Sequence, residues 1–373
     1  MPKKKILIIG STGSIGKQTL EVIKNQSNIF EIEGIACNHN IDLILEQSQQ
    51  FGIKKMAVAD ESLYKDEYKD WYWGEDELIE MIRESEAELV VMAISGAKSL
   101  RPTIAAIESG KNVALASKEV MVLAGEIINQ KVTEKGVNIL PIDSEHSAIW
   151  QALRSGKKEE IEQIILTCSG GPFLKMKSED FKNIKPQDAL KHPNWNMGQR
   201  ITIDCATLMN KGLEFIEAKW LFGVMEEKIK VVIHPQSVIH SAIQYQDGSI
   251  MAQMGEKDMR IPIQYAINYP DRHKNDFKRI EWTNLKLDFE EPDLEKFPCL
   301  ALAMEALRIG GTMPVVLNAA DEVAVELFLS GKIKFNDIPK IVEKAMRSHH
   351  PIQNPNINQI LAINKLTREE INL

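Results

Sequence analysis

The fold of the N-terminal half is decided by the stretch Lys5-Ile-Leu-Ile-Ile-Gly-Ser-Thr-Gly-Ser-Ile-Gly16. Residues 5–9 are mostly apolar and predict a buried strand, and a helical pattern over residues 15–25 begins among the glycines. Glycines at such a turn allow the backbone to approach a pyrophosphate, which the helix N-terminus then faces. The spacing G-x-x-G-x-x-G differs from the commoner G-x-G-x-x-G of dinucleotide-binding proteins. A glycine turn that binds no ligand therefore remains an alternative.

Short apolar runs alternate with amphipathic stretches as far as residue 142, which is typical of a parallel sheet covered by helices. Further strands are predicted at residues 31–36, 88–94, 112–116 and 138–142, and a second helix at residues 42–51. Residues 64–86 are acidic and aromatic without clear periodicity, so we expect an irregular surface excursion there. Residues 1–142 are therefore predicted to form a Rossmann-like nucleotide-binding domain.

The remaining sequence predicts a central α+β domain over residues 143–271 and a helical bundle over residues 299–373. In the central domain, strands are predicted at residues 161–167, 231–233 and 238–244, the last closing through a hairpin turn at residues 246–249. Residues 272–298 lack periodicity and predict a linker. Helical spacing recurs at residues 299–308, 314–329, 336–347 and 357–371. The expected fold class is α/β, in three domains.

Composition excludes several classes of protein. The 373 residues are 44% apolar and 26% charged, as in an ordinary globular protein. The formal net charge of -8 provides no basic excess for a nucleic-acid groove, so no nucleic-acid partner is expected. No apolar run is long enough for an export signal or a membrane span, so we expect a cytoplasmic protein without a membrane partner. The four cysteines form no C-x-x-C pair and are expected to be reduced.

The second predicted strand indicates which nucleotide is bound. NAD-dependent enzymes place an acidic residue at the end of this strand to bind the ribose hydroxyls. Here the strand ends near Ala36 and is followed by Cys37, Asn38, His39 and Asn40, whereas Glu33 lies inside the strand. A tip without a carboxylate favours a 2′-phosphate, so the expected cofactor is NADPH.

Two groups of polar residues predict a site for chemistry. Asp143 and Glu145 lie two positions apart just after a predicted strand, a spacing that suits an oxygen-liganded divalent cation; a helix N-cap is the alternative. Further along, Asn210 and Lys211 could bind a phosphate near a helix start, and Glu214 could supply a third metal ligand. A solvated helix face is the alternative for Glu214.

Seven successive blocks follow the order found in one family of enzymes. They are Gly10-Ser-Thr-Gly-Ser-Ile-Gly16, Ala116-Ser-Lys-Glu119, Pro141-Ile-Asp-Ser-Glu-His146, Ser169-Gly-Gly-Pro-Phe173, His192-Pro-Asn-Trp195, Asn210-Lys-Gly-Leu-Glu214 and His234-Pro-Gln-Ser-Val-Ile-His240. The chain thereby resembles the 1-deoxy-D-xylulose 5-phosphate reductoisomerase family over essentially its full length. Single blocks are weak signals, but their joint order is highly specific.

The resemblance implies a role for each matching residue. It implies a divalent cation, Mg²⁺ or Mn²⁺ and possibly Co²⁺, bound by Asp143, Glu145 and Glu214, with Lys118 and His192 completing the catalytic set. The implied substrate-binding set is Lys118, Ser144, Glu145, Ser169, His192, Trp195, Cys205, Asn210, Lys211, Glu214 and His240. The expected cofactor-binding set is Ser11, Thr12, Gly13, Ser14, Ile15, Asn38, His39, Asn40, Ser117, Glu119, Gly198 and Met259.

Three residues depart from the family pattern. Ser117 replaces the usual Asn before the Lys-Glu pair, and Cys205 replaces a Ser that helps to bind phosphate, although a thiol is the weaker hydrogen-bonding partner. His39 stands where the family often has a basic residue, which leaves the strength of NADP selection open.

The implied reaction rearranges a small phosphorylated ketose, 1-deoxy-D-xylulose 5-phosphate, and reduces the resulting aldehyde with NADPH to 2-C-methyl-D-erythritol 4-phosphate, a step of isoprenoid precursor synthesis. The resemblance also implies a homodimer. Two alternatives remain: another NADPH oxidoreductase such as an aspartate-semialdehyde dehydrogenase, which would need a nucleophilic cysteine such as Cys168, and a nucleotide-binding regulator without catalysis. A short-chain dehydrogenase is less favoured because no Tyr-x-x-x-Lys pair is present.

Overall fold

A computed structural model describes residues 3–191 and 198–371, and these residues form two compact units. The first unit comprises the residues up to Val120 together with Glu126–Ser147 and Asp258–Phe277. The second comprises Met121–Gly125, Ala148–Lys257 and the residues from Lys278 onward. Within the described residues, no helix is both long and apolar enough to cross a membrane.

The first unit is built on a seven-stranded parallel sheet with the strand order β4-β3-β2-β1-β5-β6-β7. The strands are β1 (Lys4–Ile9), β2 (Phe30–Cys37), β3 (Lys55–Val58), β4 (Tyr72–Trp73), β5 (Leu89–Met92), β6 (Asn112–Leu115) and β7 (Ile139–Pro141). Residues 6–9 of β1 and 89–92 of β5 are entirely buried, as expected for central strands covered on both faces. The predicted α/β class with a Rossmann-like N-terminal sheet is confirmed.

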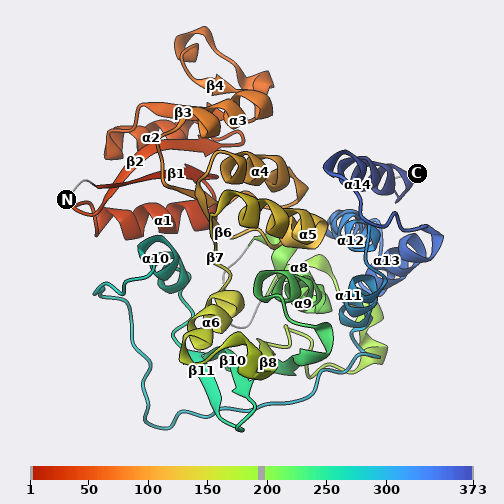
Figure 1. The fold of residues 1–373 in the computed structure, drawn as a ribbon. Coiled ribbons are helices and arrows are strands. Elements are labelled where there is room, and N and C mark those ends of the chain that lie inside the picture. The colour runs from red at the N-terminus through yellow and green to blue at the C-terminus, as the bar shows by residue number, and fades with distance from the viewer. Residues whose placement is uncertain (1–2, 192–197, 372–373) are drawn as a thin grey trace. The chain divides into compact units, whose positions relative to one another are not determined.

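Helices pack on both faces of this sheet (Figure 1). They are α1 (Ser14–Lys24), α2 (Ile41–Phe51), α3 (Gly74–Glu84), α4 (Leu100–Glu108), α5 (Lys118–Lys135) and α10 (Arg260–Asn268), and α6 (Ser144–Ala152) begins at the boundary of the unit. On one face α10 packs beside α1, where the Asn268 amide donates to the Gln26 side chain at 2.9 Å. On the other face α3 and α4 pack against each other.

The direction of the chain reverses across this sheet at β1, which lies between β2 and β5. Successive crossovers run outward from β1 to one edge and then from β5 to the other, so a crevice opens at the carboxyl ends of these two strands. Because all seven strands are parallel, the loops that follow β1, β2, β6 and β7 emerge at the same edge of the sheet. These four loops carry most of the predicted site residues of this unit.

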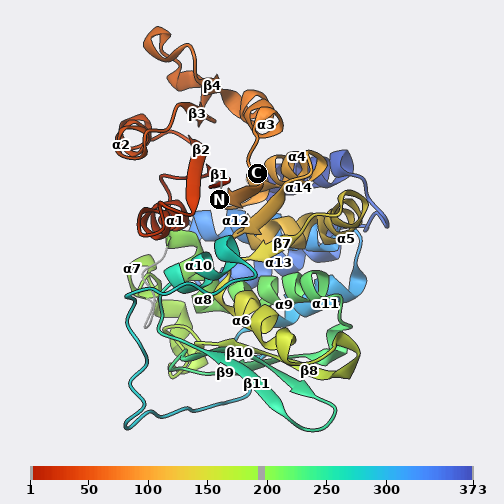
Figure 2. The ribbon, with the colours of Figure 1, turned by 60° about the vertical axis from the view of Figure 1, so that its left-hand side comes forward.

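The second unit contains a mixed four-stranded sheet with the order β11-β10-β8-β9 (Figure 2). Its strands are β8 (Ile161–Cys168), β9 (Ile229–Ile233), β10 (Ile239–Tyr245) and β11 (Ile250–Met254), and the predicted hairpin joins β10 to β11. Its principal helices are α8 (Gln199–Thr207), α9 (Met209–Phe222), α11 (Pro298–Ile309), α12 (Met313–Leu329), α13 (Asp337–Ser348) and α14 (Ile357–Ile371), and a short helix, α7, spans Pro186–Ala189.

The C-terminal helices share one hydrophobic core with the central sheet, although the sequence predicts a separate bundle. A Cβ added to Gly212 of α9 would lie 2.4 Å from the Cβ of Ala303 on α11, so these helices are in van der Waals contact. The Phe181 ring contacts those of Phe297 and Phe335, which come from the segment before α11 and from the turn before α13. Helical periodicity identifies the apolar stripe of each helix but not the element that the stripe covers.

Two further segments differ from the sequence prediction. Residues 64–86 contain β4 and the helix α3, because Leu78, Ile79 and Ile82 are buried despite the acidic composition around them. Residues 258–271, predicted to belong to the central domain, contain α10 and lie in the first unit, where the Lys4 ammonium donates to the Ile267 carbonyl at 3.1 Å. The predicted linker contains neither a helix nor a strand between Tyr269 and Phe297, apart from one bridge from Glu290 to Ile233.

A buried acidic side chain ties the outer strands of the first unit to the segment after α3. The Glu33 carboxylate of β2 accepts hydrogen bonds from Lys55 Nζ at 2.7 Å and from Ser85 Oγ at 2.8 Å. Burial raises the pKa of this carboxyl, but the bonds from Lys55, the Glu86 backbone and Ser85 outweigh burial and hold the pKa below its ordinary value. Glu33 therefore has a structural role inside the strand.

We predict that Glu33→Gln lowers the free energy of unfolding by about 1 kcal/mol at neutral pH. Since the pKa is depressed in the folded state, the carboxylate stabilises the fold above its unfolded-state pKa, near 4.5, and this contribution is lost as the pH falls through the folded-state value. Denaturant unfolding from pH 7 to pH 3 should show a difference from wild type that shrinks on acidification. Glu31→Gln, at an exposed position of the same strand, is the control. A deficit that is constant over this range would contradict the prediction.

Candidate active site

The loop after β1 has the geometry of an anion-binding turn. Gly10 has a φ of +96°, and a Cβ there would lie 2.6 Å from the Ala93 carbonyl oxygen. A Cβ on Gly16 would lie 2.2 Å from the Gly10 carbonyl oxygen, so α1 packs against the turn only because both residues are glycine. Gly13 is exposed at the N-terminus of α1, and the first turn of this helix has no acidic residue. The partial positive charge of the helix end is therefore available to a phosphate.

The predicted cofactor-binding residues around this loop differ in exposure. The Ser11 hydroxyl is buried and donates to the Gln47 side chain of α2 at 2.7 Å, so it holds the turn against the neighbouring helix. Gly13 and Ser14 are exposed, whereas Thr12 and Ile15 are half-buried. After β2, three exposed residues lie at the same edge of the sheet: Asn38, His39 and Asn40. Asn40 also caps α2, because its side-chain oxygen accepts from the Leu43 backbone at 3.2 Å.

The ends of β6 and β7 bring a lysine and an aspartate together. Lys118 begins α5 after β6, and Asp143 follows β7. Their side chains, 8% and 13% exposed, form an ion pair with 2.7 Å between Lys118 Nζ and Asp143 Oδ2. Ser117, the residue before Lys118, is fixed in place by two hydrogen bonds. Its hydroxyl bonds to Ser99 Oγ at 2.8 Å and donates to Glu119 at 2.9 Å. Two residues from neighbouring crossovers thus form a charged centre at the carboxyl edge.

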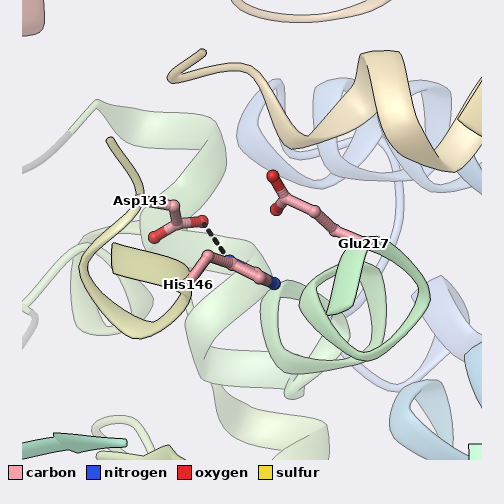
Figure 3. A group of neighbouring side chains, drawn as sticks. All are labelled: Asp143, His146 and Glu217. Atoms are coloured by element: carbon pink, nitrogen blue, oxygen red, sulfur yellow. Dashed lines mark ion pairs between the residues drawn. The ribbon is translucent and has the colours of Figure 1, made fainter. Parts of the chain in front are cut away.

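Asp143 and the residues after it combine a capping position with a polar cluster. The Asp143 carbonyl accepts the Ser147 backbone N–H at 2.8 Å, so Asp143 occupies the N-cap position of α6, as the alternative interpretation of this pair proposed. Its carboxylate nevertheless faces Lys118 and lies 3.8 Å from His146 Nδ1, a contact that Figure 3 shows. The Ser144 hydroxyl donates to Glu145 at 2.6 Å. The capping interpretation is thus observed, and the metal-ligand interpretation stays a prediction.

The second unit carries its polar residues on a corner between two helices. Leu208, with a φ of 61°, separates α8 from α9, and Asn210, Lys211 and Glu214 lie in the first turns of α9. The Glu214 carboxylate accepts from the Asn210 amide at 2.6 Å and is also paired with the Lys211 ammonium. All three side chains are buried, so a solvated helix face is excluded for Glu214. The buried Lys211 ammonium is thus kept in one position by its pairing with Glu214.

Ser169 and Cys205 lie beside the same corner. A turn with positive φ at Gly170 and Gly171 follows Ser169, and a Cβ on Gly171 would lie 2.6 Å from the Cys205 carbonyl oxygen. The Gly171 backbone N–H donates to Ser169 Oγ at 3.3 Å. The turn that follows Ser169 therefore packs against the end of α8 at Cys205.

Two buried histidines of the second unit, His240 and His234, differ in what their rings contact. His240 of β10 is buried, and its ring lies against Gly255. His234 is also buried, but both of its ring nitrogens are used by the backbone: Nδ1 bonds to the Asp288 carbonyl at 2.9 Å, and Nε2 accepts from Val238 N–H at 3.2 Å. This arrangement requires the neutral tautomer and makes His234 a structural residue.

His146 and Glu217 were not among the predicted site residues. His146 lies three residues after Asp143 and faces its carboxylate, whereas Glu217 lies three residues after Glu214 on α9 and is buried (Figure 3). The sequence offered one signal for both residues. Each lies three positions after a predicted metal ligand, and residues three apart on a helix lie on the same face.

The remaining predicted residues have the following positions. Gly198 is exposed immediately before α8, and its carbonyl accepts from Thr202 Oγ1 at 2.8 Å. Met259 precedes α10 in the first unit, where the next residue, Arg260, forms an ion pair with Glu21 of α1 at 2.5 Å. His192 and Trp195 lie outside the described residues.

The fold and the positions of the polar residues are compared with known proteins. A doubly wound parallel sheet with a glycine loop at its first strand, linked to a unit with buried basic and acidic side chains, defines a multidomain nucleotide-dependent enzyme. Three family models match the chain. The model described as 1-deoxy-D-xylulose 5-phosphate reductoisomerase matches residues 6–125, and the model described as the C-terminal domain of this enzyme matches residues 139–222. The model described as the DXP reductoisomerase C-terminal domain matches residues 254–370. The chain belongs to the 1-deoxy-D-xylulose 5-phosphate reductoisomerase family.

Individual relatives are similar over nearly the whole chain. The reductoisomerase of Thermoanaerobacter pseudethanolicus is 50% identical, covering 99% of this chain and 98% of the relative. That of Prosthecochloris aestuarii is 47% identical, covering 98% of each. The solved structure of the Zymomonas mobilis enzyme with NADPH has a TM-score of 0.93 at 39% identity, covering 99% of this chain and 98% of that one. A reductoisomerase in complex with NADPH, fosmidomycin and magnesium has a TM-score of 0.93 at 37% identity, covering 99% and 97%.

We predict that Glu214→Gln, measured with a chelator present, lowers the free energy of unfolding by about 3 kcal/mol, because it leaves the buried Lys211 ammonium without its carboxylate. The double variant Lys211→Met/Glu214→Gln should recover most of the loss. Denaturant unfolding of the two single variants and the double variant gives the coupling between the two side chains. If the double variant loses as much free energy of unfolding as the two single variants together, the pairing of Lys211 with Glu214 does not stabilise the protein.

Proposed function

We propose that the protein catalyses the NADPH- and divalent-metal-dependent conversion of 1-deoxy-D-xylulose 5-phosphate to 2-C-methyl-D-erythritol 4-phosphate, a step of isoprenoid precursor synthesis. The observation that carries the proposal is identity of 50% over 99% of the chain to a curated reductoisomerase. It is supported by the solved relative that holds NADPH, fosmidomycin and magnesium together. The roles proposed below rest on matching residues and on the geometry described within each unit.

NADPH would bind at the carboxyl edge of the parallel sheet. The exposed Gly13 and Ser14 at the N-terminus of α1 would face the pyrophosphate. The tip of β2 offers no carboxylate between residues 37 and 40, and the carboxylate inside the strand, Glu33, is engaged by Lys55. Because residues 37–40 are neutral or weakly basic, they do not repel the 2′-phosphate of NADPH. Ser117, Glu119, Gly198 and Met259 would complete the cofactor contacts.

A divalent cation fits the carboxylates available. Asp143, Glu145 and Glu214 offer only oxygen donors, the set that Mg²⁺ and Mn²⁺ prefer and that Co²⁺ also accepts. When bound, such an ion acidifies a substrate hydroxyl and stabilises negative charge on the neighbouring oxygens. Lys118, held against Asp143 in the absence of substrate, would donate to a substrate oxygen, and Ser144 would bind the adjacent hydroxyl.

The substrate phosphate would bind at the α8–α9 corner. Lys211 and Asn210 are buried donors already oriented by Glu214, so little ordering is needed when the phosphate arrives. Ser169 would add a hydroxyl, and the Cys205 thiol a weaker contact than the usual serine. His240 would line the same pocket, together with His192 and Trp195. Phosphate binding away from the reacting carbons supplies energy for orientation.

The competing dehydrogenase reaction would need a reactive cysteine. Cys168 is buried at the end of β8, and its sulfur accepts the Gly170 backbone N–H at 3.3 Å. Burial raises the pKa of the Cys37 thiol to about 11, so at neutral pH that cysteine is a thiol. Family membership points away from this reaction as well.

We predict that the protein oxidises NADPH in the presence of 1-deoxy-D-xylulose 5-phosphate and Mg²⁺, and that a chelator abolishes the reaction. Glu214→Gln should lower kcat by about 10²-fold or more, because one of three charges around the ion is lost. NADPH absorbance and product chromatography measure both. Glu305→Gln, a substitution of an exposed glutamate on α11, is the matched control. Wild-type protein that is inactive with fresh substrate and with Mg²⁺, Mn²⁺ and Co²⁺ would overturn the assignment.

We also propose that the protein acts as a homodimer in the cytoplasm. None of its four cysteines forms a disulfide, as is usual in a reducing compartment. Strand β11 lies at an edge of its sheet, and its Ile250 and Met251 side chains are 55% and 41% exposed. An open apolar edge strand is a template for pairing with a second chain.

Light scattering should give about twice the 42.1 kDa chain mass for the wild type. Ile250→Lys should shift the equilibrium toward the monomer, because a charge would be buried at the paired edge. Leu366→Lys, at an equally exposed apolar position on α14, should remain dimeric. A dimer unaffected by Ile250→Lys would place the contact elsewhere.

A further inference from the structure

Two arginines from distant parts of the sequence bind one buried glutamate in the second unit. Glu322, in the middle of α12, is 5% exposed. Arg200 Nη1 of α8 lies 2.5 Å from Glu322 Oε1, and the Arg368 guanidinium of α14 pairs with Oε2 of the same carboxylate. One side chain of α12 therefore links α8 to the last helix of the chain.

Side-chain amides fix the orientation of both guanidinium groups. Arg200 Nη2 donates to Asn318 Oδ1 at 3.1 Å, and the Asn318 amide donates in turn to Glu322 Oε1 at 3.2 Å. Arg368 Nε donates to Asn364 Oδ1 at 3.3 Å. Burial lowers the pKa of Arg368, and the nearby Arg200 charge lowers it further. The planar fork of Arg200 is thus held against two successive turns of α12.

This linkage acts on one arm of the corner that carries the proposed phosphate ligands. Arg200 lies in the first turn of α8, which ends at Thr207, and Leu208 alone separates α8 from α9. The other arm is positioned separately, because Gly212 of α9 is in close contact with Ala303 of α11. Leu208 has a left-handed conformation that leucine rarely adopts, so contacts outside the corner must hold its angle.

Only the carboxylate of this network is buried, since the side chains of Arg200 and Arg368 are 27% and 31% exposed. Loss of its charge would leave both guanidinium groups without their shared partner, and the carboxylate left to Arg200 would be that of Asp204, 3.6 Å from Arg200 Nε on the same helix. The pairing therefore favours the position of α8 at which Arg200 reaches Glu322.

We propose that Glu322 is a positioning residue, which holds α8 through Arg200 and thereby sets Asn210 and Lys211 for the substrate phosphate. The proposal rests on the function proposed for the α8–α9 corner. Glu322 lies on α12 and acts through Arg200. Through Arg368, helix α14 contributes to the same interaction.

Steady-state kinetics of Glu322→Gln test this role. The variant should raise the KM for 1-deoxy-D-xylulose 5-phosphate about tenfold, because the phosphate ligands Asn210 and Lys211 are displaced. Glu322→Asp, which keeps the charge, should recover most of the loss. Glu326→Gln makes the same change one turn along α12 at an exposed position and should behave as wild type. An unchanged KM, or a lower kcat at constant KM as a smaller folded fraction would produce, overturns the proposal.

Hydrogen exchange provides a readout that does not depend on turnover. Backbone amides of residues 199–212 should exchange faster in Glu322→Gln than in wild type or Glu326→Gln, whereas those of β8 should be unchanged. If wild type does not convert the substrate, the proposed function fails, and the exchange data still decide whether Glu322 holds the corner. Equal exchange in all three proteins at residues 199–212 would refute the coupling.

Discussion

The parallel direction of the seven strands in the first unit is the constraint on which its site depends. Because every strand points the same way, the residues after β1, β2, β6 and β7 gather at one edge, although the ends of β1 and β7, Ile9 and Pro141, are 132 positions apart in sequence. The close packing of Gly16 against Gly10 then directs the N-terminus of α1 at that edge. The same edge receives the ion pair of Lys118 and Asp143, so the cofactor loop and the charged centre share one scaffold.

The second unit meets a different requirement, which is to keep charged groups buried without losing the fold. Lys211 and Glu214 are nearly inaccessible, and each is tolerated because the other is within reach on the same helix face. The helices at the C-terminal end surround this region and share its hydrophobic core. They form part of the structure that gives the α8–α9 corner its shape, as the contact of Gly212 with Ala303 and the pairing of Arg200 with Glu322 indicate.

Different structural elements position the polar residues of the two units. In the first unit the support is the sheet edge, where strand direction sets the positions of Lys118 and Asp143. In the second unit it is a helical corner with a left-handed residue, Leu208, at its apex. Full-length similarity to reductoisomerases connects the two sets of residues in one proposed reaction.

The sequence by itself determined the glycine loop, the five principal strands of the first unit and the four C-terminal helices, because periodicity and glycine spacing are local signals. It also identified Asp143, Glu145, Lys211 and Glu214, through short spacing and the order of the family blocks. It did not identify α3, whose apolar stripe is masked by acidic neighbours, or the membership of α10 in the first unit. Only the tertiary structure decided that Lys118 meets Asp143, that Arg200 meets Glu322 and that the C-terminal helices share the central core. Such contacts depend on strand order and on which apolar faces cover each other, and neither leaves a periodic trace in the sequence.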